Sequence, residues 1–191
     1  MNAKLLGLVF AGVLGSPTIA AADTLYDWTY TDGTLAATGI LDVSGTQALS
    51  GTGTINSTNG ALSGPESLTL VTLATPGVNN LGSGNLSYRF GGGTDLIGDT
   101  TFNSGDPYVS TNGLVFLVGG PGDNGFNVWA NGTSPGGSYT GFLAGTANYE
   151  GTNGTFTVAI APVPLPVTLP LLLSGISGLG VVARRRKLAP G

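Results

Sequence analysis

Alternation of residue types near the start of the chain is the feature that most limits its fold. In TLYDWTY, residues 24–30, every second side chain is aromatic and points to one side of an extended chain: Tyr26, Trp28 and Tyr30. Asp32-Gly33 follows, and TLAATGILDV supplies a second β-prone run at 34–43. An Asp-Gly pair between two such runs is a strong hairpin signal. Residues 24–43 therefore predict two paired antiparallel strands.

The same kind of pattern continues along the chain. Seven more β-prone runs follow, at 50–55, 67–74, 85–90, 114–118, 125–130, 138–149 and 154–160. Asn-Gly pairs at 59–60, 112–113, 131–132 and 153–154 punctuate them with residues that tolerate positive φ. No stretch of helical periodicity interrupts this spacing outside the two ends. About nine short strands predict an all-β ectodomain over residues 23–160, built as an antiparallel β-sandwich or barrel. Residues 91–113 have the weakest pattern and are expected to form a long surface loop.

Composition supports a folded domain with an acidic surface. Gly is frequent, 34 of 191 residues, but 8% of residues are aromatic, which a low-complexity coil would lack. Between residues 23 and 161 Arg89 is the one basic residue, whereas all ten acidic residues lie there, so this span has a formal charge of −9. Such a surface argues against a nucleic-acid partner, because phosphates need Lys and Arg.

The first 22 residues have the pattern of a secretory signal peptide. Lys4 precedes a ten-residue apolar core, and small residues follow up to residue 22. Ala20 and Ala22 form an A-x-A site, which predicts cleavage before Asp23. An uncleaved anchor or a buried helix is the alternative, but the apolar core is shorter than the ~20 residues that span a bilayer. Residues 1–22 therefore predict export as a signal helix that is removed.

The last 31 residues, 161–191, have a different pattern. Residues 165–183 carry no charge, and as a helix they are about 28 Å long, close to the hydrocarbon thickness of a bilayer. Four basic residues follow directly: Arg184, Arg185, Arg186 and Lys187. By the positive-inside rule this cluster is a cytoplasmic stop, which leaves residues 23–161 on the other side of the membrane. A buried C-terminal core helix is the alternative, although four adjacent charges fit a membrane boundary better.

The order of features in this tail resembles a PEP-CTERM sorting signal. A proline motif comes first, then the apolar helix, then the basic cluster close to the C-terminus. The motif itself is similar to the VPLPA variant of that signal and consists of Val163, Pro164, Leu165 and Pro166. Val167 stands where that variant has Ala. The resemblance covers about 30 residues and leaves the ectodomain unassigned.

What the resemblance implies is a delivery route. It implies a Gram-negative bacterium that makes extracellular polysaccharide, export by the Sec machinery and an inner-membrane-anchored precursor. It implies recognition by an exosortase, a membrane cysteine transpeptidase, with cleavage near the proline motif. The product would be released or transferred to the cell surface or extracellular matrix. The same tail occurs on unrelated ectodomains, some of them described as ice-binding, so it does not assign an activity.

Missing residue types exclude most catalytic chemistry. The chain has no Cys and no His, so neither a Ser-His-Asp nor a Cys-His system can form, and the usual zinc and copper sites are excluded. Paired carboxylates, as in glycoside hydrolysis, are the option that is left. The candidates are Asp27, Asp32, Glu66, Asp95, Asp99 and Glu150, for which solvated turn carboxylates are the alternative. We therefore expect no catalytic residues and no enzyme activity.

Two kinds of binding remain open in the ectodomain. Calcium is the one cofactor worth considering, because residues 91–99 and 122–125 combine carboxylates, amides and Gly-rich turns. Four aromatic residues are candidates for a sugar-stacking platform, with core packing as the alternative: Trp28, Tyr108, Trp129 and Tyr139.

Three hypotheses for function follow. The first is a non-enzymatic exported protein of the cell surface or extracellular matrix that contacts polysaccharide. The second is a carboxylate-based glycan-active enzyme. The third is an ice- or surface-binding module that uses flat threonine rows, because Thr-x-Thr occurs at 29–31, 52–54 and 155–157.

Overall fold

A computed structural model of the protein describes residues 23–90, 93–120, 124–145 and 148–162. The predicted signal peptide with Ala20 and Ala22 lies outside these residues. So do the proline motif at 163–166, the predicted membrane helix at 165–183 and the basic cluster at 184–187. The described ranges contain no helix that is long and apolar enough to cross a membrane.

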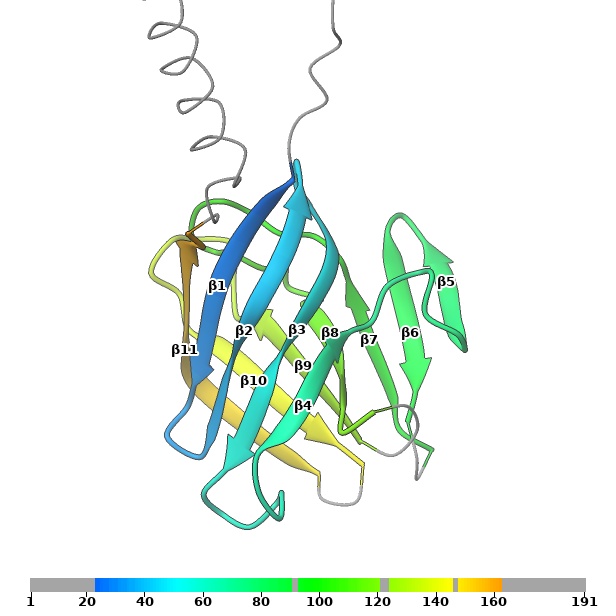
Figure 1. Ribbon diagram of the computed structural model, residues 1–191, viewed down its shortest axis with the longest axis vertical. Coiled ribbons are helices and arrows are strands. Elements are labelled where there is room, and N and C mark those ends of the chain that lie inside the picture. Colours follow the sequence, from blue (N-terminus) through cyan, green and yellow to red (C-terminus); the bar gives the residue numbers. More distant parts are fainter. Residues whose placement is uncertain (1–22, 91–92, 121–123, 146–147, 163–191) are drawn as a thin grey trace, which may run out of the picture.

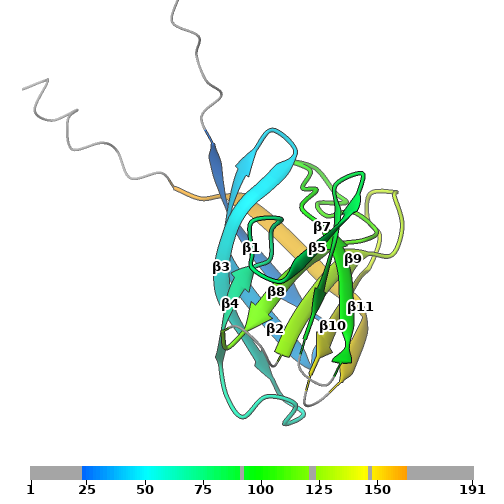
Figure 2. The same ribbon diagram turned by 90° about the vertical axis from the view of Figure 1, so that its right-hand side faces the viewer.

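The described part of the chain is all-β, as predicted. Its strands are β1 (Thr24–Thr31), β2 (Leu35–Ser44), β3 (Gln47–Ser57), β4 (Glu66–Leu70), β5 (Val78–Gly82), β6 (Asn85–Arg89), β7 (Asp95–Asp99), β8 (Leu114–Val118), β9 (Asn124–Ala130), β10 (Tyr139–Ala144) and β11 (Tyr149–Ile160). Eight of them close an antiparallel barrel in the order β1-β11-β10-β9-β8-β4-β3-β2, and β5-β6-β7 form a separate small sheet beside it (Figures 1 and 2). Of the two architectures expected, the barrel is therefore the one observed.

The predicted hairpin at residues 24–43 is confirmed and begins the barrel. β1 pairs with β2 along its whole length, from Thr24 opposite Val43 to Thr31 opposite Ala36. The carboxylate of Asp32 closes the turn, because its Oδ1 accepts hydrogen bonds from the N–H groups of residues 34 and 35, each at 2.7 Å. The alternation in the sequence thus corresponds to an inner and an outer face of the barrel wall.

Aromatic rings fill the barrel interior. Trp28 is fully buried and stacks against Phe116 and Phe156, with ring centroids 5.1 and 5.7 Å away. Gly39 lies opposite Trp28 on the adjacent strand β2, and a Cβ there would lie 2.1 Å from the carbonyl oxygen of Thr52 and 2.9 Å from Trp28 Nε1. Glycine is therefore required in the middle of β2, although it is intrinsically unfavourable in strands.

Tyr30, two residues further along β1, also packs its ring over glycines of neighbouring strands. Its ring covers Gly141 of β10 and Gly154 of β11, where an added Cβ would lie 2.5 Å from ring carbons. The hydroxyl donates to the carbonyl of Gly151 and to Asp32 Oδ2, both at 3.1 Å. Burial, together with the neighbouring Asp32 carboxylate, raises the pKa of Tyr30 above its ordinary value. Part of the high glycine content therefore reflects aromatic packing inside the barrel.

A second hydrophobic cluster lies between the small sheet and the outside of the barrel. All five residues of β8 are buried. Phe116 belongs to the cluster inside the barrel, whereas Val115 and Leu117 pack with Leu86, Phe90 and other residues of the second cluster. The continuous apolar run at 114–118 arises because β8 is covered on both faces.

The expectation of a long surface loop at residues 91–113 is wrong. This segment contains β7, and it contains Phe102 and Val109, which are 1% and 0% exposed and belong to the barrel core. Phe102 and Val109 also form an isolated β-bridge. β5 was not expected either, since it is largely exposed and consists of polar and small residues apart from Val78 and Leu81. Both β5 and β7 pair with β6, which lies between them in the sequence, and the weak apolar alternation of their own residues does not reveal this pairing.

The two ends of the described chain lie at the same end of the barrel (Figure 1). The N–H of Ala161 donates to the carbonyl of Leu25 at 2.9 Å, and Ala161 is 6% exposed. The barrel therefore extends to within two residues of the position where the predicted sorting motif begins.

Candidate functional site

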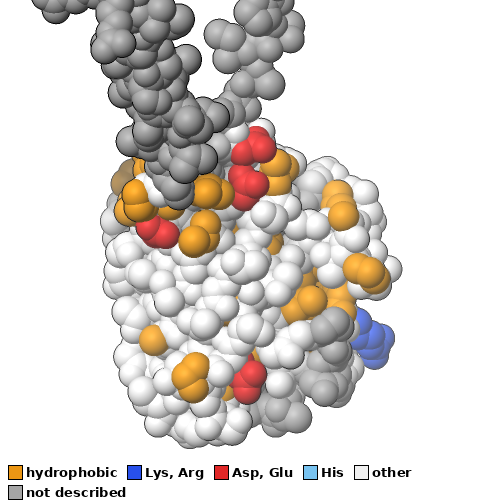
Figure 3. Space-filling view, viewed as in Figure 1, with side chains coloured by type: hydrophobic (Ala, Val, Ile, Leu, Met, Phe, Trp, Pro, Cys, Tyr) orange, Lys and Arg blue, Asp and Glu red, His pale blue; other side chains and the backbone are white. Residues whose placement is uncertain are grey.

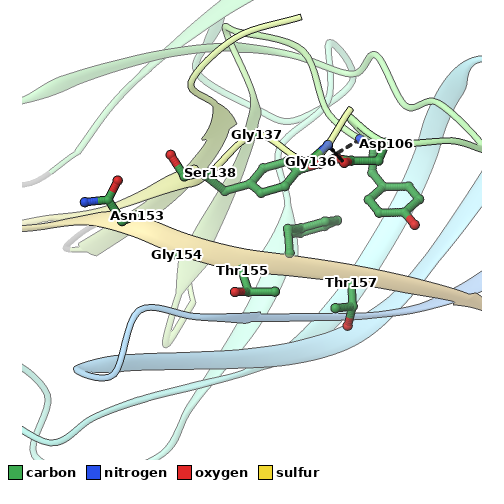
Figure 4. A pocket seen from close by; sticks show the side chains of 11 residues that line it. Asp106, Gly136, Gly137, Ser138, Asn153, Gly154, Thr155 and Thr157 are labelled. Carbon is green, nitrogen blue, oxygen red and sulfur yellow. Dashed lines mark hydrogen bonds between the residues drawn. The ribbon is translucent and has the colours of Figure 1, made fainter. Parts of the chain in front are cut away.

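The candidate site is a hollow where β10 and β11 separate. β11 pairs with β10 between Tyr149 and Gly154, and with β1 between Thr155 and Ile160. In the described residues its second half therefore has a strand partner on one side only. A hollow of about 450 Å³ lies beside this edge, lined by residues 106, 108, 136–139 and 153–157 (Figure 4). This volume falls within the range of about 300–1,000 Å³ that is usual for small-molecule sites.

Asp106 joins the two loops that border the hollow. Its Oδ1 accepts a hydrogen bond from the hydroxyl of Tyr139, and its Oδ2 accepts one from the N–H of Gly136 (Figure 4). The oxygen of Tyr139 in turn accepts a hydrogen bond from the N–H of Tyr108 at 3.0 Å. Each carboxylate oxygen therefore accepts one hydrogen bond from the protein, and these bonds fix the loop with Asp106 to the start of β10.

These hydrogen bonds determine the charge states in the hollow. The hydrogen bond from Tyr139, with that from Gly136, holds the pKa of Asp106 below its ordinary value. Burial, followed by the hydrogen bond to Asp106, raises the pKa of Tyr139 above its ordinary value. At neutral pH the pair therefore consists of a carboxylate and a neutral phenol.

The remaining groups combine an aromatic surface with hydroxyls. Tyr108 is half-buried, and its ring centroid lies 6.3 Å from that of Phe156. Thr155 and Thr157 are exposed on the other side of the β11 ribbon from Asp106 (Figure 4). Asn153, which has a positive φ of 61°, borders the hollow at its far end. The hollow thus offers neutral hydrogen-bonding groups beside an aromatic ring.

Threonines continue from the hollow across the outside of the barrel. In register, Thr157 lies opposite Thr29 and Thr155 lies opposite Thr31. The hydroxyls of Thr29 and Thr157 are hydrogen-bonded at 2.6 Å. Thr38 of β2 lies opposite Thr29 on one side and opposite Thr54 of β3 on the other, and all of these side chains are exposed. The Thr-x-Thr pairs at 29–31 and 155–157 are therefore neighbours in space.

The four aromatic residues predicted as a stacking platform do not form one surface. Trp28 is fully buried inside the barrel, so core packing, the alternative, describes it. Trp129 is half-buried on β9. Tyr108 and Tyr139 both line the hollow, but Tyr139 is 3% exposed and points its hydroxyl at Asp106. Of the four, Tyr108 is therefore the residue with an available ring in this site.

The six candidate carboxylates are spread over the barrel and the small sheet. Asp32 closes the first hairpin, and Asp99 accepts hydrogen bonds from the N–H of Thr101 and the hydroxyl of Ser110. Asp27 and Glu150 are exposed on strands, whereas Glu66 begins β4 and Asp95 begins β7. None of the six lines the hollow. Sequence reasoning missed Asp106, whose only local signal was an Asp-Pro turn.

A metal site is not evident in the part of the chain that the structure describes. There, no three acidic side chains come together in a way that could hold a metal ion. Residues 91–92 and 122–123 of the two predicted calcium-binding segments lie outside that part. Calcium binding thus stays a prediction from the sequence.

Comparison with known proteins adds no further assignment. No protein-family model matches the chain, and no curated protein or solved structure matches it either. The residues of the chain and the geometry of the hollow are therefore the features that bear on its function.

Proposed function

We propose that this chain is a non-enzymatic exported protein of the cell surface or extracellular matrix that contacts polysaccharide. The observation that carries the proposal is the hollow beside β11. It is bordered by the half-buried ring of Tyr108 and by Thr155 and Thr157, whose exposed side chains lie on the other side of the β11 ribbon from Asp106. Aromatic rings next to hydroxyl groups suit sugars, which have both apolar C–H faces and hydroxyl rims.

The delivery route in this proposal comes from the two ends of the sequence. A cleavable signal at 1–22 and a sorting signal at 161–191 suit a protein that an exosortase transfers from the inner membrane to the surface or matrix. A chain delivered by this route would be surrounded by extracellular polysaccharide. A surface with no Lys and a single Arg between residues 23 and 161 is compatible with neutral glycans.

The enzyme hypothesis receives less support from the hollow. Glycoside hydrolysis requires two carboxyl groups about 5–10 Å apart across the scissile bond. Asp106 is the one acidic side chain among the described residues that line the hollow, and both of its oxygens are hydrogen-bonded. Binding of a sugar can use the groups that border the hollow, whereas hydrolysis would need a second carboxyl group.

One experiment tests the delivery and the binding together. The mass and location of the mature protein are measured in host cells with and without the exosortase, and the released protein is then incubated with the host's own polysaccharide. We expect a shortened chain in the surface or matrix fraction that co-sediments with the polysaccharide. An intact, membrane-retained chain in cells that contain the exosortase would refute the delivery route. A released chain that ignores the polysaccharide would refute the binding role.

A second candidate function is favoured by the threonine rows. Thr38 lies in the middle of a row that runs from Thr157 through Thr29 to Thr54 on neighbouring strands, all exposed. A regular row of hydroxyl and methyl groups suits binding to an ordered surface such as ice. Inhibition of ice recrystallisation by the mature protein, abolished by Thr38→Lys, would support this candidate. Unchanged ice growth would exclude it.

A further inference from the structure

We infer that the ligand of the hollow is a neutral polysaccharide, and that its chain passes over the edge of β11 onto the outer face of β1. This inference rests on the proposed function and adds the charge and the path of the ligand. In it, Tyr108 stacks against one sugar unit in the hollow. Thr155 and Thr157 then contact the next units, and Thr29 and Thr31 extend the track.

Charge distribution argues for an uncharged ligand. Between residues 23 and 161 the formal charge is −9, with Arg89 as the one basic residue. Arg89 lies at the end of β6 in the small sheet, opposite Asp95, and does not line the hollow. An anionic polymer would therefore find no cation in the hollow and would be repelled by the surrounding surface. For a cationic sugar the described lining offers one carboxylate, Asp106, and each of its oxygens already accepts a hydrogen bond from the protein.

The edge of β11 supplies hydrogen-bonding groups of both kinds. In an antiparallel strand, successive residues direct their N–H and C=O groups to alternate sides. Along Thr155–Ile160 one side pairs with β1, so every second residue directs its backbone groups away from β1, and residues 155–157 of this edge border the hollow. Sugar hydroxyls can both donate and accept, and they can satisfy such groups without a charge.

The threonine block gives the ligand a path out of the hollow. Thr155 and Thr157 border the hollow and also face the outside of the barrel, where Thr31 and Thr29 lie opposite them. Along each strand these hydroxyls recur every two residues, a distance of about 6.8 Å. The hydrogen bond between Thr29 and Thr157 fixes two of the hydroxyls in position. Figure 3, which views this side of the barrel, shows a broad area over the middle of β1–β4 without acidic or basic side chains, with acidic side chains at its margins. An extended polymer with regularly spaced hydroxyls matches this arrangement.

An extended peptide that adds to the free edge of β11 is the competing occupant. Strand addition requires room for continuous main-chain pairing along the edge. Here Asp106 and Tyr108 from one loop and residues 136–138 from another border the same edge. The ring of Tyr108 also lies near that of Phe156, with centroids 6.3 Å apart, close to the start of the segment that has β1 as its one strand partner. These two loops leave little room for a peptide backbone to pair along the edge of β11, whereas the ring of Tyr108 can still contact a sugar.

Binding measurements with the mature exported protein test the inference. The neutral probes are dextran, a soluble β-1,3-glucan and a galactomannan, and alginate is the anionic probe; the host polysaccharide is included as a reference. Tyr108→Ala removes the stacking ring, with Tyr149→Ala as the matched control, because both tyrosines are half-buried against the barrel core. Thr155→Val with Thr157→Val removes two hydroxyls at constant shape, with Thr52→Val and Thr69→Val as exposed controls on β3 and β4.

We expect at least one neutral probe to bind with an affinity that does not change between low and high salt, since no ion pair is formed. Tyr108→Ala should weaken this binding at least tenfold, and the double valine variant about three- to tenfold, with both controls unchanged. If Tyr108→Ala does not fold, the isosteric valine variants decide the result.

Several results would overturn the inference. Preference for alginate, or binding that weakens with salt, would show a charged ligand. Retention of polysaccharide binding in both variants would place the ligand elsewhere while leaving the proposed function intact. Failure to bind any polysaccharide, including that of the host, would refute the proposed function as well. A peptide of alternating threonine and valine, which is unstructured alone and prone to form a β-strand on binding, is a further probe. If it binds and the sugars do not, the edge of β11 accepts a β-strand.

Discussion

The hydroxyl of Tyr139 donates a hydrogen bond to the carboxylate of Asp106, a residue 33 positions earlier in the chain. Tyr139 begins β10, and Asp106 lies in the loop between β7 and β8. The contact joins the two segments that border the hollow, and Gly136 adds a second hydrogen bond to the same carboxylate. The shape of the candidate site therefore depends on a polar pair between segments that are distant in sequence.

Removing the phenolic hydroxyl should loosen this pair. Tyr139→Phe keeps the buried ring but leaves the carboxylate of Asp106 and the N–H of Tyr108 without their shared partner. We expect a loss of about 1–2 kcal/mol in the free energy of unfolding. Urea unfolding measures it, and Tyr26→Phe, on β1 away from the hollow, serves as the control. An unchanged midpoint for Tyr139→Phe would mean that the pair does not stabilise the fold.

Stability should depend on pH through the same pair. The pKa of Asp106 is lower in the folded state than its ordinary value of 3.8, so unfolding takes up a proton in the window below that value. The stabilisation is therefore complete above about pH 4 and is lost as the pH falls through the folded pKa. Thermal melts from pH 7 to pH 2.5 should show a difference between the wild type and Asp106→Asn that shrinks below pH 4. A difference that is constant over the range would contradict this assignment.

At alkaline pH the sign is reversed for Tyr139. Its pKa is raised in the folded state, so the unfolded chain releases its proton first and stability falls as the pH rises above about 10. Tyr30 has a raised pKa for the same reason of burial and contributes in the same direction. Tyr139→Phe should therefore flatten part of the decline measured between pH 9 and pH 12. A decline as steep as in the wild type would show that Tyr139 does not contribute to it.

Replacing Gly154, which lies under the ring of Tyr30, by a residue with a side chain should destabilise the barrel. An added Cβ at Gly154 would lie 2.5 Å from the ring of Tyr30, which is itself 1% exposed and cannot move without disturbing the core. Gly154→Ala should therefore cost about 1–3 kcal/mol of stability, as overpacked cores do. Gly132→Ala is the matched control, because nothing lies within 4 Å of its Cβ position. Equal melting temperatures for the two variants would contradict the packing of Tyr30 over β11.

The small sheet should contribute to stability through the outer face of β8. Leu117 is 7% exposed in the cluster beneath that sheet, whereas Ile97 of β7 is 54% exposed. Leu117→Ala should cost about 2–5 kcal/mol, and Ile97→Ala should remain within about 0.5 kcal/mol of the wild type. Guanidinium unfolding compares the two. A small effect of Leu117→Ala would mean that the small sheet does not seal the barrel wall there.

Local sequence is sufficient to predict a strand where that strand has its own periodic pattern of side chains. The alternation at 24–30 and the Asp32-Gly33 turn correctly predict the first hairpin, because side-chain period and turn chemistry are short-range properties. The apolar run at 114–118 also predicts a strand correctly, but it does not say which elements cover the two faces of that strand. Residues 95–99 and 78–82 escaped recognition because their strands form by pairing with β6.

The candidate site shows the same division. Tyr108 and Tyr139 were recognised as candidate aromatic residues, but Asp106 was not, because a turn carboxylate looks alike wherever it occurs in a sequence. The Thr-x-Thr pairs were visible as pairs, whereas their placement side by side depends on the register between β1 and β11. Register is fixed by the whole barrel, since it depends on which strands meet when the sheet closes.

By itself, then, the sequence determined an all-β domain with hairpin turns, an acidic charge and no thiol or imidazole chemistry, because these follow from residue types and short spacings. It also predicts a signal at each end and, from these, the delivery route. The tertiary structure decided that the strands close into a barrel, that Trp28 and Tyr30 fill it above glycines, and that Asp106, Tyr108 and Thr155 border one hollow. The physical reason is that closure brings together residues from opposite ends of the chain, and their contacts depend on strand order and register, which no local pattern encodes.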